Sequence, residues 1–266
     1  MTFAGLFLDR PRIMGIVNVT PDSFADAGET FSTEAAVARG RAQMDAGADI
    51  IDVGGESTRP GATPVTPEEE CDRVLSVVEQ LSAAGALVSI DTRHSLVMRR
   101  AVEAGARIIN DVSALTTDED SLVSAAESGA SIVLMHMRGD PESMAERTDY
   151  DDLTGEITGY LAERVAVCEN AGIARDRLAV DPGFGFAKNA KQNFELLENL
   201  GQLSDLNLPI LVGLSRKFGL DKPPAGRLAL SLSLARTALD NGARILRVHD
   251  VAETKKMVEE WARMSA

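Results

Sequence analysis

The chain has 266 residues, enough for a sizeable core, and we expect a single domain over residues 1–266. Its 27 Lys and Arg against 41 Asp and Glu give a formal net charge of −14, which disfavours nucleic-acid and membrane partners. No apolar run is long enough to span a membrane, no signal pattern opens the chain, and Cys71 and Cys168 lack a metal-binding spacing. We therefore expect a cytoplasmic protein.

Eight short apolar runs follow one another along the chain. Most lack polar alternation, as expected for strands that are buried on both faces. The runs are Ile13–Val17, Ile50–Val53, Leu87–Ile90, Ile108–Ile109, Ser131–Met135, Leu178–Val180, Ile210–Val212 and Ile245–Val248. Helical patterns lie between and after them, at Thr33–Ala46, Pro67–Ala84, Leu96–Ala104, Ser121–Ala126, Asp152–Asn170, Gln192–Leu203, Leu228–Asn241 and Ala252–Arg263.

A glycine beside a small residue follows six of these helical patterns. Glycine adopts the left-handed conformation that ends a helix, and a short turn can then lead into the next strand. The six are Gly47, Gly85, Gly105, Gly129, Gly172 and Gly242. Together with the alternating strands and helices, they predict an α/β fold with a single (β/α)8 barrel. A doubly wound open sheet is the alternative, but no G-x-G-x-x-G motif follows the first strand.

Polar residues follow the strands at their carboxyl ends, where a barrel builds its active site. They are Asn18, Asp52, Asp91, Asn110, His136, Asp181, Ser215-Arg216-Lys217 and Arg247-Val248-His249. We expect Asp91, Asn110 and Asp181 to converge near the barrel axis, because they follow the third, fourth and sixth strands. Carboxylate and amide groups there suit a flat heterocycle rich in N–H and C=O groups.

Cationic side chains are expected around the rim of the same barrel end. They are Arg59, Lys217, Arg247 and His249, and an anionic group could lie between them. Asn18 can offer an oxygen ligand to Mg²⁺, whose other ligands would be water and phosphate oxygens. A heterocycle below and a diphosphate above predict a site that displaces a phosphate leaving group.

Motifs along nearly the whole chain resemble the signatures of the dihydropteroate synthase family, in that family's order. The two longest are Met14–Phe24 and Asp52-Val-Gly-Gly-Glu-Ser-Thr-Arg-Pro-Gly61. The shorter ones are Ser89–Thr92, Asn110–Ser113, His136–Gly139, Asp181–Phe186, Ser215–Lys217 and Arg247–Val251. The resemblance implies a barrel transferase of folate synthesis, which joins 6-hydroxymethyl-7,8-dihydropterin diphosphate to p-aminobenzoate and releases diphosphate.

The resemblance also implies roles for individual residues. The pterin would contact Asp91, Asn110, Asp181, Lys217 and Met135, and the diphosphate would contact Asn18, Arg247 and His249. Asn18 would also bind the implied cofactor, Mg²⁺. The p-aminobenzoate side would be lined by Thr58, Arg59, Pro60, Phe186, Ser215 and Phe218. The residues with catalytic roles would be Asp91, Asp181, Lys217 and Arg59.

The implied mechanism is dissociative. Diphosphate leaves first, and buried carboxylates stabilise the pterin cation that remains. The arylamine is a modest nucleophile, so generating a strong electrophile is efficient and no covalent enzyme intermediate is needed.

The chain departs from the family pattern after Lys217. The family commonly continues with a small or polar residue whose hydroxyl helps to hold the benzoate carboxylate, whereas this chain has Phe218 and reaches its next helix early. We expect a reshaped p-aminobenzoate pocket with weakened binding of sulfonamides, the inhibitors of this family. At Asn189 the family often has threonine, and we expect this change to be tolerated.

Two other functions fit a barrel with these residues. Lys217 could form a Schiff base, as in barrel aldolases. The chain could instead bind a pterin or methyltetrahydrofolate without synthase activity, although that class should lack the Thr58-Arg59 loop and the anion site of Arg247 and His249.

Several residues also have plain structural interpretations. Asp52 and Glu56 could hydrogen-bond loop amides, and His136 could be a structural hydrogen-bonding residue. We expect His94 to be solvated where it opens a helix, and the Glu68–Glu70 cluster to supply charges at a helix N-terminus. The apolar faces of the last two helical patterns predict a homodimer.

Overall fold

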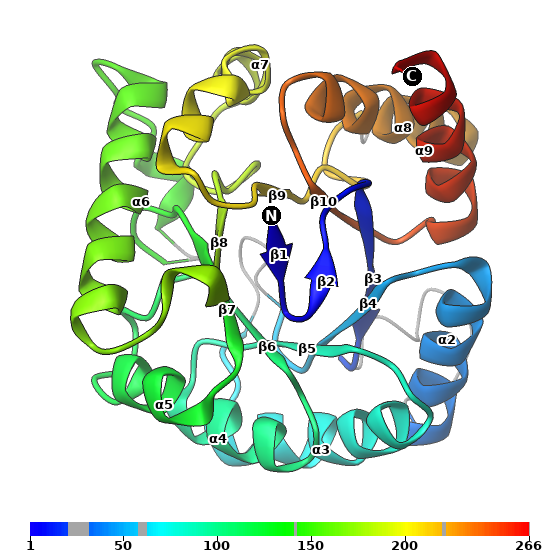
Figure 1. Ribbon diagram of the computed structural model, residues 1–266, viewed down its shortest axis with the longest axis vertical. Coiled ribbons are helices and arrows are strands. Elements are labelled where there is room, and N and C mark those ends of the chain that lie inside the picture. Colours follow the sequence, from blue (N-terminus) through cyan, green and yellow to red (C-terminus); the bar gives the residue numbers. More distant parts are fainter. Residues whose placement is uncertain (21–31, 58–62, 141–142, 220–221, 266) are drawn as a thin grey trace.

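The structure is a computed structural model that describes residues 1–20, 32–57, 63–140, 143–219 and 222–265. Eight parallel strands form its barrel (Figure 1). They are β3 (Arg12–Asn18), β4 (Ile50–Gly54), β5 (Val88–Asp91), β6 (Ile108–Asp111), β7 (Ser131–Met135), β8 (Leu178–Asp181), β9 (Leu211–Val212) and β10 (Ile245–Val248). A parallel bridge between Val180 and Ile210 brings the two ends of this sheet together. The predicted (β/α)8 barrel is therefore confirmed, and the open sheet is excluded.

Helices surround the barrel in chain order (Figure 1). They are α2 (Thr33–Ala46), α3 (Pro67–Ala83), α4 (Ser95–Glu103), α5 (Ser121–Ser128), α6 (Leu153–Asn170), α7 (Ala190–Glu198), α8 (Pro224–Asp240) and α9 (Val251–Ser265). The 3-10 segments are η1 (Met144–Glu146), η2 (Arg175–Arg177) and η3 (Leu200–Leu206). Within the described residues no helix has the length and apolar character needed to cross a membrane.

Local capping explains where the helices begin and end. The hydroxyls of Ser32 and Thr66 accept backbone N–H groups in the first turns of α2 and α3. The prediction of one helix from Gln192 to Leu203 is wrong at both ends. Asn189 and Gln192 form a capping box, so α7 starts earlier than predicted. Helix α7 then ends at Glu198, and η3 continues the chain.

The six predicted turn glycines all have left-handed backbones. Their φ angles lie between 70° and 114°. A side chain with a Cβ would be strained at such angles, so glycine permits the short return from helix to strand. These returns bring each new strand in parallel beside the previous one.

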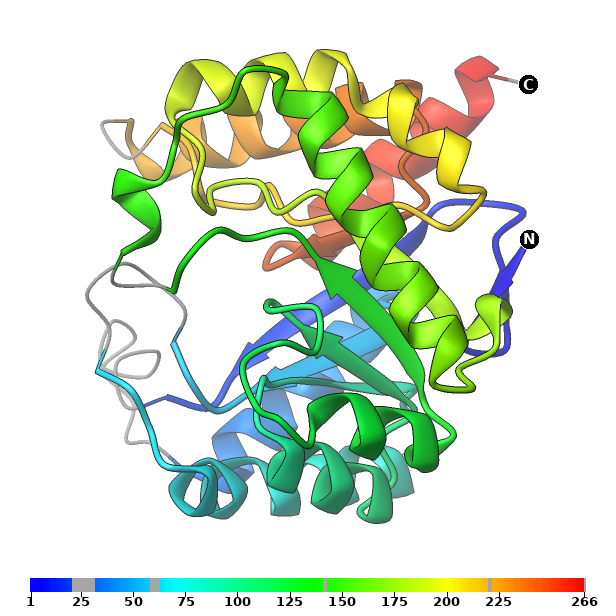
Figure 2. The same cartoon turned by 90° about the vertical axis from the view of Figure 1, so that its left-hand side faces the viewer.

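The barrel interior has a separate apolar core at its lower end. Its buried residues include Met14, Ile50, Ile108, Val133, Ala179, Leu211 and Ile245. Phe3, 1% exposed, joins this core from an antiparallel hairpin of β1 (Thr2–Phe3) and β2 (Leu6–Phe7) that the sequence analysis did not predict. Figure 1 shows the hairpin at the centre of the barrel, and Figure 2 shows it at the opposite end from η1. The hairpin thus closes the amino end.

Replacing Phe3 by Ala should lower the free energy of unfolding by about 3–4 kcal/mol, because it leaves a cavity against the interior core. Phe7→Ala on the same hairpin is the control, since Phe7 is 70% exposed and its loss should cost less than about 0.5 kcal/mol. Urea unfolding of both variants measures the difference. Equal losses would contradict the role of Phe3 in closing the barrel.

Candidate active site

Four polar side chains from β4, β5, β6 and β10 meet at the carboxyl end of the barrel. Arg247 Nε donates to Asp52 Oδ2 at 2.6 Å, and the second arm of the guanidinium pairs with Asp91. Asn110 Nδ2 donates to the same Asp52 oxygen at 3.2 Å. We call Asp52, Asp91, Asn110 and Arg247 the acid cluster. Residues separated by up to 195 positions in the chain are therefore in direct contact.

Arg247 does not lie on the rim, where the sequence analysis expected it. Its guanidinium lies between two acids at the barrel mouth, because burial of two like charges requires a cation between them. Although burial alone lowers it, the Asp52 and Asp91 carboxylates together raise the pKa of Arg247. Burial raises the pKa of Asp91 to about 7, against the lowering effect of Arg247.

The acid cluster keeps unused hydrogen-bonding capacity. Asp52 is fully buried, and its Oδ1 has no partner among the described residues. The buried hydroxyl of Ser89, which is paired with Asp52 in the strand register, also lacks a partner there. Such groups are costly unless a polar ligand or water bonds to them, so the barrel mouth is prepared for one.

Lys217 and Asp181 form the other half of the site. Lys217 Nζ donates to the Phe184 carbonyl at 2.7 Å and lies 4.5 Å from the centre of the Phe186 ring. Burial lowers the pKa of Lys217 to about 8, although the Asp181 carboxylate opposes it. Arg247 and Asp91 also act on this pKa, which indicates that both halves share one electrostatic environment. Asp91, Asn110 and Asp181 end β5, β6 and β8 at one end of the barrel, as predicted, and Lys217, expected on the rim, is half-buried beside them.

A glycine turn at the end of β8 joins these groups. Asp181 Oδ1 accepts the N–H of Gly183 at 2.7 Å, and burial raises the pKa of this carboxyl group. Gly183 has a φ of 73°, and a Cβ there would lie 2.0 Å from the carbonyl oxygen of His136. The Gly183–Phe186 turn thus packs directly on the end of β7, which only glycine at position 183 allows.

Sequence reasoning missed Lys188, which follows this turn. Its side chain is 7% exposed, and its Nζ lies 3.1 Å from His136 Nδ1. His136, singled out from the sequence, is buried beside Tyr150 and Tyr160, and burial lowers its pKa to about 3. The structural interpretation of His136 therefore fits better than that of a charged ligand.

The remaining predicted residues lie at or near the same end. Ser215 Oγ accepts the backbone N–H of His249 at 3.2 Å and lies 3.1 Å from its Nδ1. The Ser215 hydroxyl is thus already paired with His249. Met135 and Phe186 are buried in one small apolar cluster, and Asn18 is half-buried at the end of β3. Thr58, Arg59 and Pro60 lie outside the described residues.

Phe218 is half-buried, and its ring lies 6.0 Å from that of Phe194 on α7. The residue that replaces the family's hydroxyl is therefore engaged in an aromatic contact with the neighbouring helix. That contact adds apolar surface beside Lys217.

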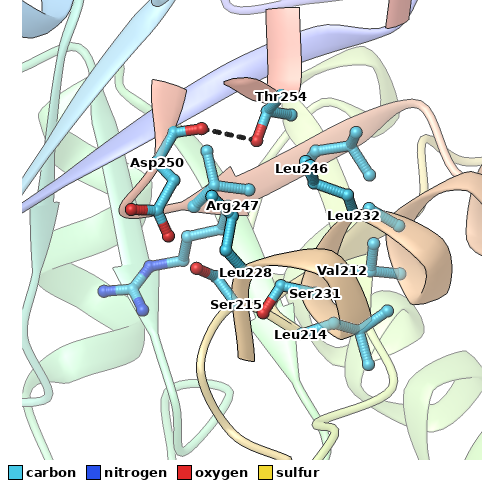
Figure 3. A pocket seen from close by; sticks show the side chains of 12 residues that line it. Val212, Leu214, Ser215, Leu228, Ser231, Leu232, Leu246, Arg247, Asp250 and Thr254 are labelled. Carbon is cyan, nitrogen blue, oxygen red and sulfur yellow. Dashed lines mark hydrogen bonds between the residues drawn. The ribbon is translucent and has the colours of Figure 1, made fainter. Parts of the chain in front are cut away.

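A mainly apolar pocket lies behind the site, between α8 and the ends of β9 and β10 (Figure 3). Its lining includes Val212, Leu214, Leu228, Leu232 and Leu246. In Figure 3 the Arg247 guanidinium extends away from these side chains. The pocket therefore belongs to the packing of α8 rather than to the polar site.

Two ion pairs lie at the loops after β4 and β5, and the first includes the loop amide contact expected for Glu56. Glu56 forms a bidentate pair with Arg93 and also accepts the N–H of Val65 at 3.2 Å. Glu70 is fully buried, with His94 Nδ1 2.7 Å from its carboxylate. His94 was expected to be solvated and instead contacts Glu70, because the start of α4 packs close to α3. Glu70 lies in the first turn of α3, as predicted.

Fold and site together define a barrel enzyme with a cluster of polar side chains at its carboxyl end, and comparisons with known proteins identify its family. The model of the pterin binding enzymes matches residues 14–249. Dihydropteroate synthase of Escherichia coli K12 is 48% identical, over 94% of this chain and 90% of that protein. The Haemophilus influenzae enzyme is 41% identical, over 96% and 94%.

Solved structures agree with these relatives. A Xanthomonas albilineans dihydropteroate synthase with 4-aminobenzoic acid has a TM-score of 0.92 and 46% identity, covering 99% of this chain and 97% of that one. A Yersinia pestis dihydropteroate synthase with a sulfonamide drug has a TM-score of 0.93 and 43% identity, covering 98% and 97%. The chain therefore belongs to the pterin binding enzymes and, within them, to the dihydropteroate synthases, which are transferases. The resemblance seen in the sequence is confirmed, and the barrel without synthase activity is not favoured.

Replacing Arg247 by Met should lower the free energy of unfolding by about 3 kcal/mol at pH 8, because two buried carboxylates lose their counter-ion. The loss should be smaller at pH 6. Without Arg247 the pKa of Asp91 rises above its present value of about 7, and the carboxyl group then takes up a proton.

Arg216→Met is the matched control for this measurement. The exposed Arg216 pairs with Asp250, so its loss should cost at most about 1 kcal/mol. Denaturant unfolding of both variants at pH 6 and pH 8 measures the effect. An Arg247→Met variant as stable as the wild type at pH 8 would contradict the proposed charge balance.

Proposed function

We propose that the chain joins 6-hydroxymethyl-7,8-dihydropterin diphosphate to p-aminobenzoate, forming 7,8-dihydropteroate and diphosphate in folate synthesis. The observation that carries this proposal is the buried polar site at the barrel mouth, in a chain of this family. Similar proteins hold related molecules: one Xanthomonas albilineans dihydropteroate synthase, 43% identical, is solved with 7,8-dihydropteroate.

The pterin ring would bind over the acid cluster and beside Lys217. Asp52 Oδ1 and the Ser89 hydroxyl have hydrogen-bonding capacity left, as a ring with N–H and C=O groups requires. Asp91, Asn110 and Asp181 would accept or donate to the ring edge, and Met135 would contact its face. The Lys217 ammonium is held beside Phe184, so it can bond to the ring without a large movement.

Diphosphate would lie above this ring, near Asn18, Arg247 and His249. Arg247 would divide its donors between the acids and the leaving group. His249 is oriented by the Ser215 hydroxyl, which directs the imidazole at a defined angle.

Mg²⁺ is the cofactor that we propose for this step. Within the described residues, no group of three or more His, Cys, Asp or Glu side chains could hold a metal ion. Asn18, half-buried at the end of β3, can instead give one protein oxygen to an ion that keeps water and phosphate oxygens. When bound, Mg²⁺ supplies positive charge that helps diphosphate to leave.

The reaction is proposed to be dissociative. As diphosphate leaves, positive charge develops on the pterin, and the carboxylates of Asp91 and Asp181 stabilise it. Lys217 and Phe186 border the position from which the arylamine attacks, and Arg59 would help to close that side. The amine then loses its proton to solvent, and no side chain forms a covalent bond.

We also propose a homodimer in the cytoplasm. Phe194 on α7 is 46% exposed, and α8 carries half-buried leucines beside it, which supports a second copy as the partner of this face. Two buried free cysteines fit a reducing compartment. Sedimentation equilibrium tests the dimer, and cell fractionation tests the compartment.

A coupled assay of diphosphate release from the pterin diphosphate, with and without p-aminobenzoate, tests the function. We expect p-aminobenzoate and Mg²⁺ to be required for sustained turnover, and chelation of Mg²⁺ to stop it. Asp181→Asn should lower kcat/KM at least about 100-fold, since a charge next to the pterin cation is lost. The exposed Asp205→Asn is the control and should stay within about twofold. No release under any condition would overturn the proposal.

Phe218 is proposed to weaken binding of p-aminobenzoate and sulfonamides. Phe218→Ser should raise the affinity for p-aminobenzoate about tenfold, because a hydroxyl can again bond the carboxylate, and should strengthen sulfonamide binding in the same direction. Phe194→Ser, which breaks the same ring contact without adding a hydroxyl at position 218, is the control. Isothermal titration against the complex with pterin diphosphate measures both ligands. Ordinary affinity of the unaltered protein for both would contradict the idea.

A further inference from the structure

Lys188 is a buried cation for which the proposed reaction has no use. Its Nζ lies 3.0 Å from the carbonyl oxygen of Gly183, 2.9 Å from that of Phe186, and 3.1 Å from His136 Nδ1. An ammonium group has three donors and no acceptor, and here three acceptors lie within hydrogen-bond distance. Lys188 is only 7% exposed, and each of its three donors thus has an acceptor inside the protein.

These contacts join both ends of the Gly183–Phe186 turn to the end of β7. Lys188 bonds the first and last carbonyl groups of the turn, and His136 belongs to the neighbouring strand end. The backbone N–H of His136 donates to the Asp181 carbonyl at 2.9 Å, so the same histidine is also bonded to β8.

Other side chains hold the outer part of this loop. Asn193 Oδ1 accepts the N–H of Gly185 at 2.7 Å, and its Nδ2 donates to the carbonyl of Lys188 at 3.0 Å. The Tyr150 hydroxyl donates to the Ala187 carbonyl at 3.0 Å. Lys188 alone reaches both ends of the Gly183–Phe186 turn among these contacts.

The Gly183–Phe186 turn also positions Lys217. Lys217 Nζ bonds the Phe184 carbonyl and faces the Phe186 ring, so both of these contacts of the ammonium group come from this turn. A shift of the turn would therefore move Phe186 and Lys217 together. The hydrogen bonds of the acid cluster described above instead join β4, β5, β6 and β10 to one another.

We propose that Lys188 is a positioning residue of the synthase: through its bonds to Gly183, Phe186 and His136 it fixes the wall against which p-aminobenzoate binds. This inference rests on the proposed function. It assigns to Lys188 no contact with substrate, and it predicts a selective effect on the second substrate.

The groups around Lys188 act on its charge in both directions. Burial lowers the pKa of Lys188 to about 7, Asp181 opposes that effect, and Lys217 and Arg138 add to it. His136 stays neutral, because burial and Lys188 lower its pKa to about 3, so its Nδ1 can accept from the ammonium. Tyr150 and Tyr160 both lie against His136, and burial raises the pKa of each.

Lys188→Met tests the proposal, because it keeps the length of the side chain and removes its donors. We expect the KM for p-aminobenzoate to rise about tenfold, while the KM for the pterin diphosphate stays within about threefold. Lys191→Met is the matched control, since Lys191 is exposed one turn further along the same segment. A lysine needed only for folding would lower the active fraction, and hence the apparent kcat, without changing either KM.

If Lys188→Met does not fold, two variants of His136 test the same contact. His136→Asn keeps an acceptor close to the position of Nδ1, whereas His136→Leu removes it. We expect His136→Leu to raise the KM for p-aminobenzoate and His136→Asn to stay near the wild type. Equal KM values in the two folded variants, or an unchanged KM in folded Lys188→Met, would overturn the proposal.

The wild-type control separates this failure from failure of the proposed function. If the unaltered protein releases diphosphate only with p-aminobenzoate, the function stands, and the variants report on Lys188 alone. Thermal melting of every variant establishes that folded proteins are compared.

Discussion

The ion pairs of Arg247 are the interaction on which the site depends. Asp52 and Asp91 lie on adjacent strands at the barrel mouth, and one guanidinium from β10 pairs with both. Two buried carboxylates without a cation would take up protons or push the strand ends apart. Because Arg247 reaches them from its own strand, the protein can keep acids at this position before any substrate binds.

A second constraint comes from the glycine turn after β8. The turn lies against β7 so closely that position 183 has no room for a side chain. From there it presents a carbonyl group and an aromatic ring to Lys217. Ion pairs thus hold the side chains of the acid cluster in place, whereas backbone packing fixes the position of Lys217. The two halves of the site are therefore positioned by different interactions, and strands of one barrel provide both.

The sequence predicted the strands well, because buried parallel strands are short apolar runs with a polar residue at their end. Ser131–Met135 and Ile245–Val248 were predicted with the observed limits, and so was the helix from Thr33 to Ala46. The polar residues at the carboxyl ends of the strands were predicted from the same pattern. The hairpin that holds Phe3 was missed, because its two-residue strands are too short to show a period.

Contacts made by long side chains could not be predicted in this way. Arg247 looked like a rim residue, since the pattern gives a strand end but not how far the side chain reaches across the mouth. No role was predicted for Lys188, because its burial depends on carbonyl groups that only the folded turn brings together. His94 and Glu70 formed a pair for a similar reason, as two helix starts pack side by side.

The hairpin that closes the amino end of the barrel has a practical consequence. Met1 is exposed at that end, away from the polar mouth. A short affinity tag or a surface linker attached there would extend from the amino end of the barrel and leave the carboxyl end facing the solution. Tethering through the first residue therefore orients every copy in the same useful way for binding experiments on a sensor surface.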